Sequence, residues 1–118
     1  MPVRPRRNPE IVWRLEQGMR EVAWEKAHKG EEYEDLGVLT LVVGEAIHQL
    51  NLVGAEIWTR INSVNTVEKI AAEIASLFHA DPGEMQADVM EFLKDIEEKG
   101  WVTLPAGSSH SAPKWKAK

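Results

Sequence analysis

The chain has 118 residues, 43% of them hydrophobic and 28% charged, and its formal net charge is −5. These values suit one globular domain with a modest core. The absence of cysteine excludes disulfides, thiolate nucleophiles and cysteine-ligated metal sites. No apolar run approaches the ~18 residues of a membrane span, and the basic N-terminus lacks the apolar stretch of a signal peptide, so we expect a cytoplasmic protein without a membrane partner.

The charge is distributed unevenly along the chain. Residues 1–20 contain five arginines and two glutamates, residues 105–118 contain three lysines, and residues 21–104 contain 17 acids and six bases. Three prolines interrupt residues 1–9, which we expect to be a disordered basic arm. Residues 105–118 are polar and rich in small side chains, so we expect a disordered tail.

Residues 10–35 combine a strand-like segment with an acidic one. Residues 10–15 (EIVWRL) are rich in β-branched and aromatic side chains, which favours a first strand. Apolar residues from Met19 keep helical spacing, whereas four acids cluster behind Gly30. We expect residues 21–35 to be an exposed, partly helical acidic insertion, in which Trp24 is a candidate anchor for a partner.

A β-hairpin is predicted next. Residues 38–43 (VLTLVV) form a short apolar run typical of a strand. Gly44-Glu45 fits a tight turn with glycine at its first central position, and residues 46–50 (AIHQL) continue as a second strand.

Three amphipathic helices are predicted to follow, over about residues 52–61, 67–78 and 82–99. Their N-caps are Asn51, Thr66 and Asp81, and Gly100 ends the third helix. Each helix has one apolar face, made by Val53, Gly54, Ile57, Trp58 and Ile61, by Val67, Ile70, Ala71, Ile74, Leu77 and Phe78, and by Met85, Val89, Phe92, Leu93 and Ile96.

These elements predict an α+β fold. N-terminal strands and a β-hairpin precede a three-helix bundle, which is a winged helix-turn-helix-like arrangement. After the third helix, residues 101–104 are predicted to be extended. We expect residues 10–104 to form a single domain.

The sequence contains no pattern typical of catalysis or of cofactor binding. Its eight glycines form no phosphate-binding loop, and its four histidines fall in four different elements without metal-ligand spacing. Acids recur at intervals of three and four residues along 84–98, as on a solvated helix face. We therefore predict no enzymatic activity, no cofactor and no metal.

Binding is the remaining class of function. In a DNA-binding winged helix the third helix would enter the major groove, but residues 82–99 carry six acids, two lysines and no arginine, which argues against a nucleic acid partner. A sheet edge beside an apolar helix can instead accept a peptide as an added strand. Residues 46–50 and 82–99 are the natural pair.

Three runs of sequence resemble the PqqD family of peptide chaperones. They are LVVGEAIHQLNLVGAEIWTRI, TVEKIAAEIA and DVMEFLKDIEEKGWV, within residues 36–104. The turn at residues 62–65 departs from the family, whose members often carry Asp-Gly there, and residues 21–35 look like an insertion.

The resemblance implies a non-catalytic chaperone of ribosomally made peptides. Such a protein binds the leader of a precursor peptide by strand addition and presents it to a radical S-adenosylmethionine enzyme, as in pyrroloquinoline quinone biosynthesis or a related pathway. Carried over to this chain, the resemblance gives as peptide-binding residues Ile47, His48, Gln49, Leu50, Val89, Phe92, Leu93 and Ile96.

Two alternatives stay open from the sequence: a winged-helix DNA-binding regulator, and a subunit that docks on another protein. The oligomeric state, monomer or dimer, is also open, because small domains of this kind can exchange strands.

Overall fold

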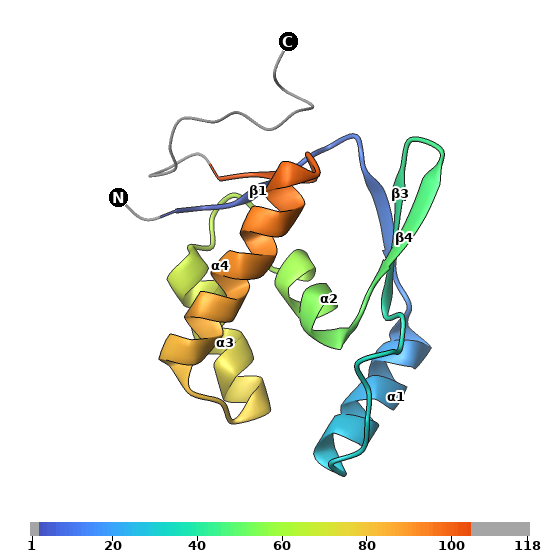
Figure 1. Ribbon diagram of the computed structural model, residues 1–118, viewed down its shortest axis with the longest axis vertical. Helices are drawn as coiled ribbons and strands as arrows, with labels where there is room; N and C mark the ends of the chain where they lie inside the picture. The colour runs from blue at the N-terminus through green and yellow to red at the C-terminus, as the bar shows by residue number, and fades with distance from the viewer. Residues whose placement is uncertain (1–2, 105–118) are drawn as a thin grey trace. The chain divides into compact units, whose positions relative to one another are not determined.

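The computed structural model describes residues 3–104, which group into two compact units (Figure 1). Pro9–Trp58 make up one, here called the sheet unit. The other, here called the helical unit, contains residues 3–8 and 59–104 of the described chain.

The sheet unit contains one antiparallel sheet of three strands. These are β2 (Val12–Leu15), β3 (Leu39–Val43) and β4 (Ala46–Leu50), in the order β2-β3-β4. Val43 lies opposite Ala46, so the turn between β3 and β4 has two residues. Gly44 has φ +62°, which its lack of a side chain permits, and the predicted hairpin is confirmed.

Two helices complete this unit, α1 (Gln17–His28) and α2 (Leu52–Thr59), although Thr59 itself groups with the helical unit. The Asn51 side chain caps α2, because its Oδ1 accepts a hydrogen bond from the Gly54 amide at 3.0 Å. The rings of Trp13 on β2 and Trp58 on α2 meet edge to face, with centroids 6.5 Å apart. Helix α2 is therefore joined to the sheet by aromatic packing.

The acidic segment is more regular than predicted. Helix α1 occupies much of it, Ala23 is fully buried, and Trp24 Nε1 donates to the buried Glu56 carboxylate at 2.9 Å. Trp24 is half-buried and bonded within the unit, and its role as an anchor for a partner stays a prediction. Whether residues 21–35 are an insertion stays a prediction.

The helical unit is built on two helices, α3 (Val67–Phe78) and α4 (Pro82–Glu98), which pack on each other. Both predicted caps are confirmed: Thr66 Oγ1 accepts from the Lys69 amide, and Asp81 Oδ2 accepts from the Glu84 amide at 2.9 Å. The apolar faces are buried largely as predicted, although Phe78 and Phe92 are half-buried and Leu77 is 39% exposed.

The N-terminal residues form a strand in this unit, so the prediction of a disordered arm over residues 1–9 is wrong for its described part. Strand β1 (Arg6–Arg7) pairs antiparallel with β5 (Val102–Thr103). Asn8 is buried, and its Nδ2 donates to the Gly100 carbonyl at 3.1 Å. The pairing partner is more than 90 positions away in the sequence, so local composition gives no sign of it.

The α+β class is confirmed, and the predicted elements occur in the predicted order. The winged helix-turn-helix arrangement and the single domain over 10–104 stay predictions. The predicted tail, 105–118, lies outside the described residues. Among residues 3–104, no helix has both the length and the hydrophobicity needed to cross a membrane.

Candidate functional site

Strand β4 is an edge strand, since β3 lies on one side of it and the sheet unit supplies no strand on the other. In an antiparallel pair of strands, the backbone N–H and C=O groups of successive residues point alternately toward the partner strand and away from it. The pair that flanks the turn, Val43 and Ala46, faces inward, and so does the pair of Leu41 and His48. The backbone N–H and C=O groups of Ile47 and Gln49 therefore point to the outer edge.

The same alternation along β3 directs the backbone groups of Leu41 and Val43 toward β4 and those of Thr40 and Val42 toward β2. Val38, just before β3, bonds to both sides: its carbonyl accepts from the Glu16 amide at 2.7 Å, and its amide donates to the Leu50 carbonyl at 2.8 Å. The outer edge of β4 consequently offers two donors and two acceptors at a spacing of two residues, which is what an added strand requires.

The four predicted site residues of β4 divide between the two faces of the sheet. His48 and Leu50 share a face with Leu41 and Leu39, their register partners. Leu50 is buried there, whereas His48 is exposed. Ile47, 71% exposed, and Gln49, also exposed, lie on the opposite face.

The other four predicted site residues belong to α4 in the helical unit. Val89, Leu93 and Ile96 are at most 1% exposed and are members of that unit's core. Phe92 is half-buried, so it retains side-chain surface for a ligand. The prediction that these residues bind a peptide together with β4 stays a prediction.

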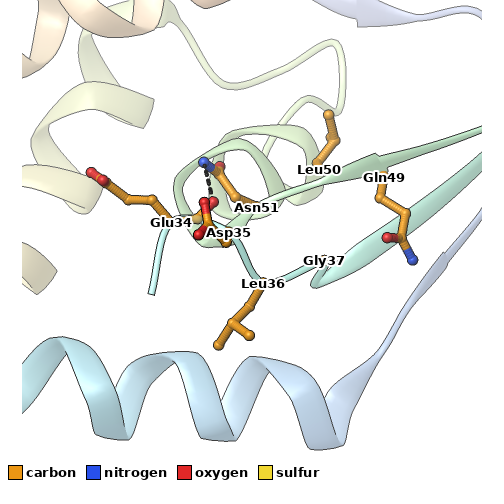
Figure 2. A pocket seen from close by; sticks show the side chains of 7 residues that line it. All are labelled: Glu34, Asp35, Leu36, Gly37, Gln49, Leu50 and Asn51. Atoms are coloured by element: carbon orange, nitrogen blue, oxygen red, sulfur yellow. Dashed lines mark hydrogen bonds between the residues drawn. The ribbon is translucent and has the colours of Figure 1, made fainter. Parts of the chain in front are cut away.

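A polar pocket of about 240 Å³ lies at the end of β4 within the sheet unit (Figure 2). Two of the predicted site residues, Gln49 and Leu50, line it. The full lining is Glu34, Asp35, Leu36, Gly37, Gln49, Leu50 and Asn51. Asn51 Nδ2 donates to the Glu34 carbonyl at 3.4 Å, which ties the acidic segment to the start of α2. A side chain at position 37 would overlap Gln49, so glycine there leaves room for the Gln49 amide.

The electrostatic character of this region is acidic. Burial, and then the neighbouring Glu34 carboxylate, raises the pKa of the Tyr33 phenol above its ordinary value of 10.0, so Tyr33 is neutral at physiological pH. Within residues 3–104, no three acidic or histidine side chains are grouped so that they could hold a metal ion. The arrangement is suited to hydrogen bonding with a backbone and to contacts with side chains.

A family model described as coenzyme PQQ synthesis protein D (PqqD) matches residues 37–102, more than half of the chain. The chain belongs to the PqqD family. The matched region begins just before β3 and includes β4, α2, α3 and α4. The resemblance found in the sequence is therefore confirmed.

One similar solved structure is the solution NMR structure of the PqqD truncation of Methylobacterium extorquens PqqCD. That protein is described as a functional, stand-alone recognition element for ribosomally synthesized and post-translationally modified peptides. The two chains are 19% identical, the TM-score is 0.58, and the alignment covers 86% of this chain and 88% of the other. This likeness shows that the PqqD fold is shared. No curated protein matches the chain.

Proposed function

We propose that this PqqD-family protein recognises a ribosomally made precursor peptide. The leader part of the peptide binds as an added strand on the outer edge of β4 and is presented to a radical S-adenosylmethionine enzyme, while the chain itself does no catalysis. Membership of the PqqD family and the fold shared with a recognition element support this proposal.

The observation that carries the proposal is the outward direction of the Ile47 and Gln49 backbone groups at a sheet edge. Each residue of an added strand that faces them can exchange two main-chain hydrogen bonds. Affinity from such bonds is independent of sequence, so side-chain contacts on both faces must supply the specificity.

The first experiment identifies and titrates the peptide. A short open reading frame beside a radical S-adenosylmethionine enzyme gene, near the gene for this chain, supplies the sequence of a synthetic peptide. Titration of that peptide into the isotope-labelled full chain is expected to shift the NMR signals of residues 46–50. A scrambled peptide of equal composition is the control, and shifts that spare β4 would contradict the proposal.

A pair of variants separates the backbone contribution from the side-chain contribution. Gln49→Pro removes an outward N–H without removing a bond to β3, and it is expected to weaken peptide binding. Gln49→Thr keeps the N–H and the strand propensity, so binding through the backbone should be largely retained. Equal loss in both variants would indicate that the Gln49 side chain, rather than the strand edge, holds the peptide.

A further inference from the structure

A row of exposed aliphatic side chains crosses the sheet of the sheet unit. Val42 of β3 lies opposite Val12 of β2 on one side and Ile47 of β4 on the other. Opposite residues of a sheet share a face, so these three side chains form one line across it. Val12 is 67%, Val42 39% and Ile47 71% exposed, so the line, here called the outer row, is open to solvent.

The next row on the same face is polar. Thr40 lies opposite Arg14 and opposite Gln49. Glu16 organises this row, because its Oε2 accepts from Arg14 at 3.0 Å and from the Thr40 hydroxyl at 3.2 Å. The face thus changes from apolar to hydrogen-bonding over a step of two residues along each strand.

Both rows end at β4, on the residues whose backbone groups point outward. Ile47 and Gln49 are therefore the residues that an added antiparallel strand would meet directly. A strand on this edge would supply a fourth member to each row, next to Ile47 and next to Gln49. Aliphatic and aromatic cross-strand neighbours stabilise a sheet, whereas a charge beside an apolar row loses its hydration without gaining a partner.

We infer that the outer row selects the peptide and fixes its register. The favoured precursor peptide carries a β-branched or aromatic residue beside Ile47 and a hydrogen-bonding residue two positions away, beside Gln49. This inference rests on the proposed function and adds to it a sequence requirement on the face formed by Val12, Val42 and Ile47. We assign the peptide, rather than another ligand, to this edge because Ile47 both ends the apolar row and directs its backbone groups outward.

A random peptide library displayed on messenger RNA tests the requirement with the full chain. Peptides selected on the wild-type chain are expected to share an apolar residue and, two positions away, a polar one. Selection on Ile47→Lys is expected to replace the apolar preference at that position with an acidic one. Peptides selected on the wild-type chain should bind Ile47→Lys more weakly, by a factor of about two to five.

Val64→Lys is the matched control, since Val64 is 69% exposed, aliphatic and located in the helical unit. Its selected peptides should equal those of the wild type. One outcome would overturn this inference and leave the proposed function standing. In that outcome, the selected peptides shift the NMR signals of β4 but share no apolar residue followed two positions away by a polar one. Selected peptides that spare β4, or a library without binders, would contradict both.

A second copy of the chain is the competing occupant of the outer row. Sedimentation of the free wild-type chain and of Ile47→Lys distinguishes the two cases. Equal monomeric masses support a row that is open for the peptide. A wild-type dimer that Ile47→Lys converts to monomer would show that the row is covered by another copy, and would overturn the inference.

Discussion

Arg20 and Glu56 form an ion pair inside the sheet unit, with Arg20 Nε 2.8 Å from Glu56 Oε2. The Glu56 side chain is 1% exposed and that of Arg20 is 32% exposed. Trp24 donates to the same carboxylate oxygen at 2.9 Å. Two side chains of α1 therefore bind one buried carboxylate of α2. These contacts make α1 an integral part of the sheet unit.

Removal of Arg20 is expected to destabilise the chain. Arg20→Ala leaves the Glu56 carboxylate buried with one fewer charge-assisted bond, and the free energy of unfolding should fall by about 1–3 kcal/mol. Denaturant unfolding measures the change. Arg14→Ala is the control, because the Arg14 side chain in its pair with Glu16 is 78% exposed and such pairs contribute less than about 1 kcal/mol. An equal effect of both variants would refute the structural role of the Arg20–Glu56 pair.

Local signals in the sequence were sufficient to predict the hairpin and the three helices that follow it. A short apolar run and a glycine turn predicted the hairpin, and Asn51, Thr66 and Asp81 cap their helices as predicted. Cap and turn patterns depend on neighbours within four residues, so the chain carries them explicitly. Features that depend on distant partners were missed, namely the burial of Glu56 and the strand at Arg6–Arg7.

The candidate site shows the same division. The resemblance to the PqqD family identified β4, and the structure adds that Ile47 and Gln49 face one side while His48 and Leu50 face the other. The outer row could not be predicted from the sequence, because Val12 and Ile47 are on strands that do not pair with each other. Only the register of β3 between them shows that they share a line.

Asn8 is expected to anchor the N-terminal strand. Asn8→Ala removes the donor to the Gly100 carbonyl and leaves a buried acceptor without it, at an expected cost of about 1–3 kcal/mol. Hydrogen exchange at Thr103 should accelerate, because Thr103 pairs with Arg6. The Asn8 amide donates to the Trp101 carbonyl, and the alternation of the ladder then directs the Thr103 amide toward the N-terminal strand. The exposed Arg6 supplies the control variant Arg6→Ala. Unchanged exchange at Thr103 in Asn8→Ala would argue against an ordered N-terminal strand.

The cap of α4 is expected to contribute to stability. Asp81→Ala removes the acceptor for the Glu84 amide and should lower the free energy of unfolding by about 0.5–2 kcal/mol. Asp81→Asn retains an acceptor oxygen, so its free energy of unfolding should fall much less. Thermal unfolding of the three proteins in parallel checks the order, and a loss in Asp81→Asn as large as that in Asp81→Ala would contradict it.

Glu97 is expected to make stability depend on pH. Burial, and then the charge of Glu98, raises the pKa of the Glu97 carboxyl above its ordinary value of 4.5, against an opposing effect of Lys94. A carboxyl with a raised folded pKa stabilises below the unfolded pKa, and this stabilisation is lost as the pH rises through the folded value. Glu97→Gln should therefore be more stable than the wild type at neutral pH.

The advantage of Glu97→Gln should disappear below pH 4.5, the ordinary pKa of the group. Denaturant unfolding at a series of pH values measures it. Glu91→Gln provides the control, since Glu91 is an exposed acid on the same helix. A difference between Glu97→Gln and the wild type that is independent of pH would contradict the assignment.

Hydrogen exchange along β4 tests the central claim, peptide addition to its edge, most directly. In the free chain the outward amides of Ile47 and Gln49 should exchange faster than the inward amide of His48. Saturation with the precursor peptide should slow exchange at Ile47 and Gln49 and change little at His48. Exchange at Ile47 and Gln49 that stays fast while the peptide is bound would contradict strand addition to β4.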